Sequence, residues 1–403
     1  MNTVPPTTLL AEATDLADDL SALRHELHQF PEMGLHLPVT QAVVLRALEA
    51  LGLEVTTGSG LSSVVAVLRG GRPGPAVLLR GDMDALPVTE ASGEPFTSQV
   101  DGVMHACGHD LHVAGLVGAA RLLAAHREEL AGSVVFMFQP GEEGHHGARL
   151  MIEEGVLDAA GERVVAAYGL HVVSSLIPAG VITGRPGPAM AAADQMYVMV
   201  RGRGGHGSAP HLAADPVPVA AEIVLALQSA VTRQFDAHDP VVVSVGRLAA
   251  GTIDNVIPDT AELDATVRTF SPEQHALIPG RLTRLVEHIA AAHGLTAEVD
   301  YVRGYPVTVN DPDEVRRAER VVTSLTGTQG YVTAPRPVSG AEDFSYVLEQ
   351  VPGAFLFLGA TPEGADPATA PYNHAAGARF GDAALPVAAA VLAGLALDRL
   401  AEG

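Results

Sequence analysis

The sequence predicts a two-domain α/β protein, with a largely parallel sheet in one domain and a ferredoxin-like α+β domain inserted into it. Its 403 residues exceed what one hydrophobic core usually organises. Strand-like and helix-like runs alternate over residues 1–185, and the chain returns to this domain over residues 304–403, as in parallel sheets. Between them, residues 186–303 follow the order β-α-β-β-α-β, which is typical of a ferredoxin-like domain.

The composition indicates an acidic, soluble protein. Lys and Arg number 24 against 47 Asp and Glu, giving a net charge of −23, which argues against binding to nucleic acid or to an anionic membrane. Residues 1–20 lack the pattern of a secretory signal, and the single cysteine, Cys107, agrees with a reducing cytoplasm. The longest uncharged run, residues 164–184, is interrupted by Pro178 and Gly180, so we interpret it as strand and loop.

Apolar spacing and stop signals place the elements of the first domain. Helices are expected over residues 9–30, 40–51, 111 to about 129, 148–154, 314–326 and 383–400. Pro31 and Gly52 end the first two, and Asp110 is the expected cap of the third. Strands are expected at residues 63–68, 76–80, 133–138, 164–170 and 354–358.

The insert follows a linker rich in Gly and Pro, residues 184–188. Its strands are expected at residues 196–200, 241–248, 262–270 and 296–302, and its helices at 215–235 and 272–293. A segment of about 110 residues is long enough to form a small domain of its own.

Three strands of the first domain deliver acidic or imidazole side chains at their carboxyl ends. Asp82 and Asp84 follow one strand, Glu142 and Glu143 follow the next, and His171 ends a third. Open α/β sheets bind ligands at these ends, so we expect the side chains to meet there.

A fourth source of ligands is the segment from His105 to Asp110, which holds Cys107 and His109 two residues apart. Alone, this spacing favours a buried cysteine beside a helix cap. Its combination with the three strand ends instead predicts a metal site.

The expected metal ligands are Cys107, His109, Glu143, His171 and His374. Five ligands exceed the needs of one tetrahedral zinc, so two divalent ions (zinc, manganese, cobalt or nickel) are predicted. The Cys107 thiolate is the expected protein bridge between them, because a thiolate can bind two metals. Such a pair would serve hydrolysis of an amide.

The acids beside these ligands are given separate roles. Glu142 is the expected general base, because it adjoins a metal ligand; the alternative is a solvated Glu-Glu loop. Asp82 or Asp84 would orient a ligand histidine, or would serve only to shape a turn. His28 and His112 are interpreted as helix-surface or satisfied buried histidines.

In the insert, His206 lies in a glycine-rich turn, Asn255 lies in a second turn and Arg268 lies on a strand. From these residues alone, a structural turn is favoured over a phosphate loop, because the spacing of the glycines does not match one.

Taken in order, seven segments resemble those of the dinuclear-metal amidohydrolases and aminoacylases, the family of hippurate hydrolase, N-acetyldiaminopimelate deacetylase and the indole-acetyl-amino-acid hydrolases. The segments span residues 81–87, 105–110, 139–144, 169–171, 204–211, 255–259 and 341–344. The resemblance covers nearly the whole chain.

This resemblance implies a metallopeptidase-like catalytic domain with the ligands named above and Glu142 as acid and base. It also implies that the insert forms a homodimer, that His206 stabilises the oxyanion in the partner's active site, and that Asn255 and Arg268 help to hold the substrate carboxylate or the dimer contact.

We therefore expect a metal-dependent amidohydrolase that cleaves small N-acyl amino acids to a carboxylic acid and a free amino acid. A dipeptidase or aminopeptidase with the same site is the first alternative. A non-catalytic metal- or ligand-binding protein is the second, although pure binding gives no role to Glu142.

Overall fold

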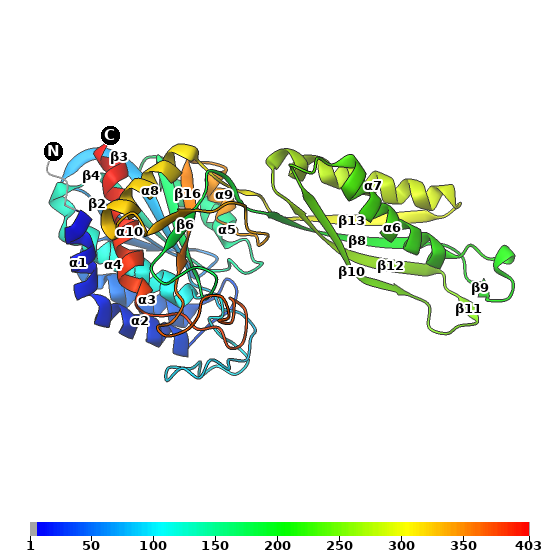
Figure 1. Cartoon of the computed structure of the whole chain (residues 1–403), viewed down its shortest axis with the longest axis horizontal. Coiled ribbons are helices and arrows are strands. Elements are labelled where there is room, and N and C mark those ends of the chain that lie inside the picture. Colours follow the sequence, from blue (N-terminus) through cyan, green and yellow to red (C-terminus); the bar gives the residue numbers. More distant parts are fainter. Residues whose placement is uncertain (1–5, 403) are drawn as a thin grey trace. The chain divides into compact units, whose positions relative to one another are not determined.

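The computed structural model describes residues 6–402, which form two compact units (Figure 1). The first unit contains the chain up to Ala189 together with Val309–Arg336 and Asp343–Gly403. The second contains Met190–Thr308 and Pro337–Glu342. The chain thus passes from one unit to the other after residue 189 and returns after residue 308, four to five residues later than the sequence analysis places these boundaries.

An eight-stranded sheet, in the order β1-β2-β4-β3-β5-β16-β6-β15, forms the centre of the first unit. Its strands are β1 (Glu54–Thr57), β2 (Val64–Arg69), β3 (Arg72–Asp82), β4 (Ala131–Gln139), β5 (Ala166–Val173), β6 (Ile182–Gly184), β15 (Tyr331–Thr333) and β16 (Gly353–Gly359). The central neighbours β4, β3, β5 and β16 are parallel, whereas β1, β2 and the β6–β16 pair are antiparallel. The expected largely parallel sheet is confirmed.

Helices cover this sheet (Figure 1). They are α1 (Pro6–Asp15), α2 (Ala17–Gln29), α3 (Pro38–Leu48), α4 (His109–Ala125), α5 (Gly147–Glu153), α8 (Pro312–Thr326), α9 (Ser345–Leu348) and α10 (Ala384–Ala401), with short 3-10 turns η1 (Glu49–Leu51), η2 (Arg127–Glu129) and η3 (Val156–Asp158). The prediction of a single helix over residues 9–30 is wrong, since Leu16 separates α1 from α2. No Gly or Pro marks that break.

The helices α4 and α10 pack closely against each other. A Cβ atom added at Gly115 would lie 3.0 Å from Cβ of Ala388, and one at Gly118 would lie 2.7 Å from Cβ of Ala389. Glycine is therefore required where the two helix surfaces touch. Among the described residues, α10 is the one helix long and apolar enough to cross a membrane, but most of it is buried in this core.

The second unit is a four-stranded antiparallel sheet, in the order β10-β12-β8-β13, with two helices on one face (Figure 1). Its main elements are β8 (Ala192–Arg201), α6 (Pro216–Gln234), β10 (Val241–Ala250), β12 (Thr260–Thr269), α7 (Pro272–Ala292) and β13 (Thr296–Tyr305). The ferredoxin-like arrangement is confirmed by this order. Smaller elements are β9 (Gly205–His206), β11 (Val256–Ile257) and η4 (Pro210–Leu212), and β7 (Gly187–Met190) pairs with β14 (Thr308–Asn310).

Three of the longer helices begin with the same local device, a capping side chain followed by proline. Asp215, Ser271 and Asp311 each accept a hydrogen bond from a backbone N–H in the first turn of α6, α7 and α8. Proline in the next position has no N–H to leave unpaired, so the pair defines the helix start.

Candidate metal centre

The strand ends of the first unit meet as the sequence analysis predicts. Strands β4 and β5 both pair with β3 in parallel, so the carboxyl ends of all three lie at one edge of the sheet. Asp82 is the last residue of β3, Glu142 follows β4 closely, and His171 lies near the end of β5. The sheet edge therefore gathers side chains that are about 30 to 90 positions apart in the chain.

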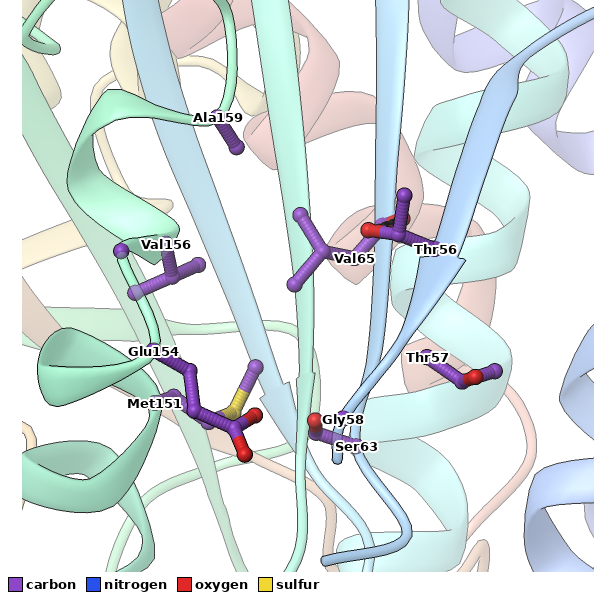
Figure 2. A pocket seen from close by; sticks show the side chains of 10 residues that line it. Thr56, Thr57, Gly58, Ser63, Val65, Met151, Glu154, Val156 and Ala159 are labelled. Carbon is purple, nitrogen blue, oxygen red and sulfur yellow. Dashed lines mark hydrogen bonds between the residues drawn. The ribbon is translucent and has the colours of Figure 1, made fainter. Parts of the chain in front are cut away.

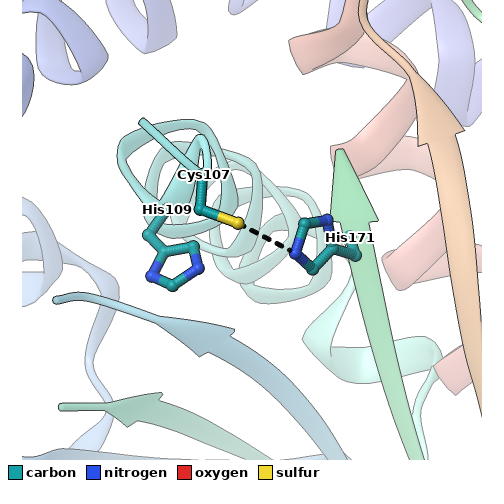
Figure 3. Close-up of side chains that lie close together, drawn as sticks. All are labelled: Cys107, His109 and His171. Carbon is teal, nitrogen blue, oxygen red and sulfur yellow. Dashed lines mark hydrogen bonds between the residues drawn. The ribbon is translucent and has the colours of Figure 1, made fainter. Parts of the chain in front are cut away.

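Cys107 lies at the centre of two groups of ligand-type atoms. The first group combines its thiol with His109 and His171, and the Sγ atom lies 3.4 Å from Nε2 of His171 (Figure 3). The second combines the thiol with Glu143 and His374, whose Nε2 atom lies 3.2 Å from both Sγ of Cys107 and Oε1 of Glu143. All five expected ligands are thus brought together, and one sulfur belongs to both groups.

The histidine rings are oriented so that Nε2 faces this cluster. Nδ1 of His109 donates to the backbone oxygen of Asp84 at 2.7 Å, and Nδ1 of His171 donates to the backbone oxygen of Val172 at 2.8 Å. Nε2 of His109 and Oε1 of Glu143 are buried and form no hydrogen bond of normal geometry, although each has a group of possible opposite charge 3.2 Å away. Because buried polar atoms are normally satisfied, these atoms fit the donor set of bound divalent cations.

The cluster also favours the ionised thiol. Burial raises the pKa of Cys107, but the positive charge of His171 and the contacts from His109, His171 and His374 outweigh it and hold the pKa well below its usual value. The thiolate is the form of cysteine that binds metal, and it can bind two ions at once.

The two adjacent glutamates are presented by a turn that Asp84 holds. Its carboxylate accepts the backbone N–H of Glu142 at 2.9 Å and that of Glu143 at 3.0 Å. A carboxylate oxygen of each glutamate lies within 4.8 Å of a ring nitrogen of His109, so the pair faces the same site. The Glu142 side chain is buried there, which excludes the solvated loop that was the alternative.

His374 reaches the cluster through an unusual backbone conformation. Its φ angle is 70°, in the left-handed region, and its N–H donates to the oxygen of Ala106 at 2.8 Å. The preceding Asn373 ties this loop to β5, because its side chain donates to the oxygen of Val172 at 3.0 Å and accepts from the N–H of Ser174 at 3.0 Å. Asn373 is a positioning residue that the sequence analysis missed, and only its place beside His374 pointed to it.

The structure gives Asp84 both of the roles considered for the two aspartates, and gives Asp82 a different position. Asp84 orients His109 through its backbone oxygen, whereas its carboxylate serves the glutamate turn. The Asp82 carboxylate lies 3.2 Å from the cluster-facing Nε2 of His109 and accepts a hydrogen bond from Nδ1 of His112 at 2.5 Å. Arg80 forms an ion pair with it at 2.8 Å. Asp82 thus stands beside the cluster rather than behind His109.

Asp110 was expected to cap the following helix and does not. Helix α4 already begins at His109, after Gly108 with a φ angle of 81°. The Asp110 carboxylate is instead buried, where its Oδ2 accepts from Nε of Arg24 and from Nδ1 of His28, both at 2.9 Å. The hexapeptide that carries the ligands is therefore anchored to helix α2.

The three residues expected to act from the insert lie in the second unit. His206 on β9 pairs with Val256 on β11, which places it beside Asn255. Arg268 lies toward the other end of β12, eight positions after Thr260, and donates to the oxygen of Val267 at 3.2 Å. At about 3.4 Å per residue, roughly 27 Å of strand separates Thr260 from Arg268, so one chain does not bring Arg268 together with His206 and Asn255.

A separate cavity of about 230 Å³ lies in the first unit, between strands β1 and β2 and the segment from α5 to η3 (Figure 2). Glu154 is its only acidic lining residue, and one of its oxygens already accepts hydrogen bonds from Ser59 and from the N–H of Gly60. No histidine or cysteine is among the residues that line this cavity, so it lacks the ligand types gathered around Cys107.

Comparison with known proteins agrees with this geometry. The model of peptidase family M20/M25/M40 matches residues 78–398, which is well over half of the chain and contains every candidate ligand. The chain belongs to this family. It is therefore a hydrolase of the M20 type, built on a site that combines histidine, carboxylate and thiol groups.

Several M20 relatives are similar over most of their length. A thermostable carboxypeptidase 2 of Saccharolobus solfataricus is 40% identical over 356 residues, covering 87% of this chain and 88% of that protein. An N-acetylcysteine deacetylase of Bacillus subtilis is 40% identical over 339 residues, covering 84% and 87%. An IAA-amino acid hydrolase ILR1-like 2 of Arabidopsis thaliana is 37% identical over 396 residues, covering 97% and 88%.

Solved structures give the same result. The YXEP protein of Bacillus subtilis, described as a dinuclear metal-binding peptidase of the M20 family, is 34% identical with a TM-score of 0.83, and the match covers 96% of this chain and 99% of that one. A protein from methicillin-resistant Staphylococcus aureus is 31% identical with a TM-score of 0.90, covering 97% and 99%. The M20 fold is thus common to this chain and these two neighbours, and the Cys107 cluster is a candidate metal site in this chain.

Proposed function

We propose that this M20 protein hydrolyses the amide bond of small N-acyl amino acids and releases a carboxylic acid and a free amino acid. The observation that carries the proposal is the position of Cys107 in two ligand groups, with the carboxylate of Glu142 beside them. The names of its relatives give the substrate class, since a deacetylase of N-acetylcysteine and hydrolases of IAA-amino acids are among them.

The five clustered residues would hold two divalent ions, with Cys107, His109 and His171 around one and Cys107, Glu143 and His374 around the other. Bound cations of this kind polarise an amide carbonyl and make water more acidic. Imidazole and thiolate ligands suit zinc, cobalt and nickel, and the carboxylate also suits manganese.

Glu142 would act as acid and base. Its carboxylate takes a proton from the attacking water, and then returns it to the nitrogen of the departing amino acid. The adjacent Glu143 cannot share this work when its oxygen, 3.2 Å from Nε2 of His374, serves as a ligand. The separation of the two roles explains why this turn presents both glutamates.

His206 would complete the site from a second subunit. Its Nδ1 accepts hydrogen bonds from the N–H and the hydroxyl of Ser208, at 3.1 and 2.9 Å, so in the neutral ring the proton lies on Nε2 and that exposed atom is a donor. Such a donor is suited to a developing oxyanion.

The spacing within the insert supports a homodimer. Because Arg268 lies roughly 27 Å along the strand from the His206 end, both can serve one substrate only when they come from different chains. The His206 end also has a hollow of about 760 Å³ and exposed apolar side chains, among them Ile253 at 59% and Val256 at 52% exposure. These residues are available for contact with a second copy.

A second candidate is a carboxypeptidase or dipeptidase, which the two carboxypeptidase relatives at 40% and 39% identity favour. A substrate panel separates the two activities. Purified protein is loaded in turn with Zn²⁺, Mn²⁺, Co²⁺ or Ni²⁺ and assayed with N-acetyl amino acids, N-benzoyl amino acids, dipeptides and longer peptides.

We expect kcat/KM for at least one N-acyl amino acid to exceed that for every peptide by about tenfold or more, a difference of about 1.4 kcal/mol in transition-state binding. Preference for peptides would assign the second candidate. Metal binding without turnover of either class would indicate a binding protein, and Glu142→Gln provides the inactive control for background hydrolysis.

A further inference from the structure

His112 occupies a position between the elements that carry the first ligand group. It lies on α4, three residues after His109, and both ring nitrogens are engaged. Nδ1 contacts Oδ1 of Asp82 at 2.5 Å, and Nε2 accepts the backbone N–H of Val172 at 2.8 Å. Because a backbone N–H can only donate, Nε2 carries no proton and Nδ1 is the donor to Asp82.

These two hydrogen bonds connect three separate parts of the chain. Asp82 ends strand β3 and lies 3.2 Å from Nε2 of His109. Val172 follows His171 on β5, and its oxygen accepts the Nδ1–H of that ligand. One imidazole on α4 is thus bonded to the carboxylate beside one ligand and to the backbone N–H of Val172, the residue whose carbonyl oxygen orients another.

The ring of His112 also packs between the two ligand rings. It is stacked on His109, with ring centroids 5.2 Å apart and planes at 28°, and it meets His171 edge-on at 4.8 Å and 68°. The ring is almost completely buried. Its packing alone could be supplied by phenylalanine, but its pair of directed hydrogen bonds could not.

We propose that His112 is a positioning residue for the metal held by Cys107, His109 and His171, and that it has little influence on the group formed by Cys107, Glu143 and His374. His112 lies in a group with Asp82 and His109 that is close enough to hold an ion, but both of its nitrogens are used in hydrogen bonds, which favours a positioning role over a ligand role. It acts by fixing the distance between α4, the end of β3 and β5, and so the spacing of His109 and His171. The proposal rests on the proposed dinuclear function.

Substitutions can separate the two hydrogen bonds. His112→Phe keeps a ring and removes both bonds. In His112→Asn the amide nitrogen replaces Nδ1 and can still donate to Asp82, whereas in His112→Gln the longer side chain places an amide oxygen near the former Nε2, where it can accept from Val172. His126→Phe is the matched control, since His126 caps the far end of the same helix and bonds to Glu12 at 2.7 Å.

The full-length protein, in the oligomeric state in which it purifies, is freed of metal and titrated with Co²⁺. Binding is followed by the thiolate-to-cobalt absorption, and the number of bound ions is measured by elemental analysis after dialysis. Wild type and His126→Phe should bind two ions per chain. His112→Phe should bind one ion with unchanged affinity and the other about 10- to 100-fold more weakly, which is the usual cost of losing a partner of a metal ligand. Asn or Gln should recover part of this loss.

The proposal would be overturned if His112→Phe bound both ions with the affinities of the wild type and showed an unchanged absorption spectrum. If His112→Phe does not fold, as judged by circular dichroism, the Asn and Gln variants decide: wild-type affinity at both positions in both variants would overturn it, and weakening confined to one position would support it. Failure of the wild type itself to bind two ions would instead refute the proposed dinuclear function.

Discussion

Sγ of Cys107 lies 3.2 Å from Nε2 of His374, although 267 positions separate these residues in the chain. The same sulfur is 3.4 Å from Nε2 of His171, which comes from a different strand end. One thiol thus links two sets of ligands that reach the site from opposite parts of the sequence. Loss of this thiol should therefore affect both metal positions.

We expect activity to require divalent metal and Cys107→Ser to lower the content of both ions. The pKa of Cys107 is held well below its usual value, despite burial, by His171 and the neighbouring imidazoles, whereas a serine hydroxyl remains protonated at neutral pH. Elemental analysis before and after chelation, with activity measured after metal is restored, checks both statements. Full turnover in protein shown to be metal-free would contradict the first.

Glu142→Gln and Glu143→Gln should have different effects on metal content. The first should retain both ions and lose about a hundred- to ten-thousand-fold in kcat, the usual effect of removing a general base. The second should lose metal as well, because Oε1 of Glu143 is a buried atom of the ligand cluster. Metal content and kcat are measured on the same samples. A Glu142→Gln enzyme within a few-fold of wild type would show that the role is misassigned.

The sequence was sufficient to predict that candidate ligands gather at one edge of the sheet, because parallel strands place them there. Once Asp82, Glu143 and His171 are placed at the ends of neighbouring parallel strands, their proximity follows from the topology and does not depend on details of packing. The ferredoxin-like insert was predictable for a similar reason, since its strands β8 and β12 alternate buried residues with less buried ones and its helices begin at Asp-Pro or Ser-Pro.

The supporting residues could not be predicted, because their roles depend on side-chain direction. His112 looks like any histidine on an apolar helix until β3 and β5 are placed on either side of it. Asp110 had the expected identity of a helix cap, but Arg24 and His28 offer its carboxylate stronger, charge-assisted hydrogen bonds. The short edge strand β1 was missed because all its residues are exposed and give no alternating pattern.

His28 gives a prediction about stability and pH. Burial lowers the pKa of its ring, but Asp110 and Glu90, which contact its two nitrogens at 2.9 and 3.1 Å, raise it to about 9. Because the pKa of His28 in the folded state lies above its ordinary value of about 6.5, the charged ring stabilises the folded protein. This contribution to the free energy of unfolding is complete below about pH 6.5 and is lost as the pH rises through about 9.

The free energy of unfolding of wild type should accordingly exceed that of His28→Gln most at pH 6, and the difference should shrink by about 3 kcal/mol by pH 10. Urea unfolding of chelator-treated protein, followed by circular dichroism, measures this difference at each pH. A gap between the two proteins that stays constant from pH 6 to pH 10 would show that the buried His28 is not charged in the folded state.

His206 is expected to serve the active site of a second subunit. His206→Ala and Glu142→Gln proteins should each be nearly inactive, because the first loses an oxyanion donor, which commonly costs about a hundred- to a thousand-fold in kcat, and the second loses the general base. When the two variants are mixed under conditions that exchange subunits, they should regain activity.

In a mixed dimer, the His206→Ala chain supplies an intact Glu142 and receives His206 from its partner, so one site is complete while the other lacks both groups. At equal amounts, half of the dimers are mixed and each has one working site of two, so about a quarter of wild-type activity is expected if exchange is random. Mass spectrometry measures the mixed dimers. Their presence without recovered activity would show that His206 does not act across the interface.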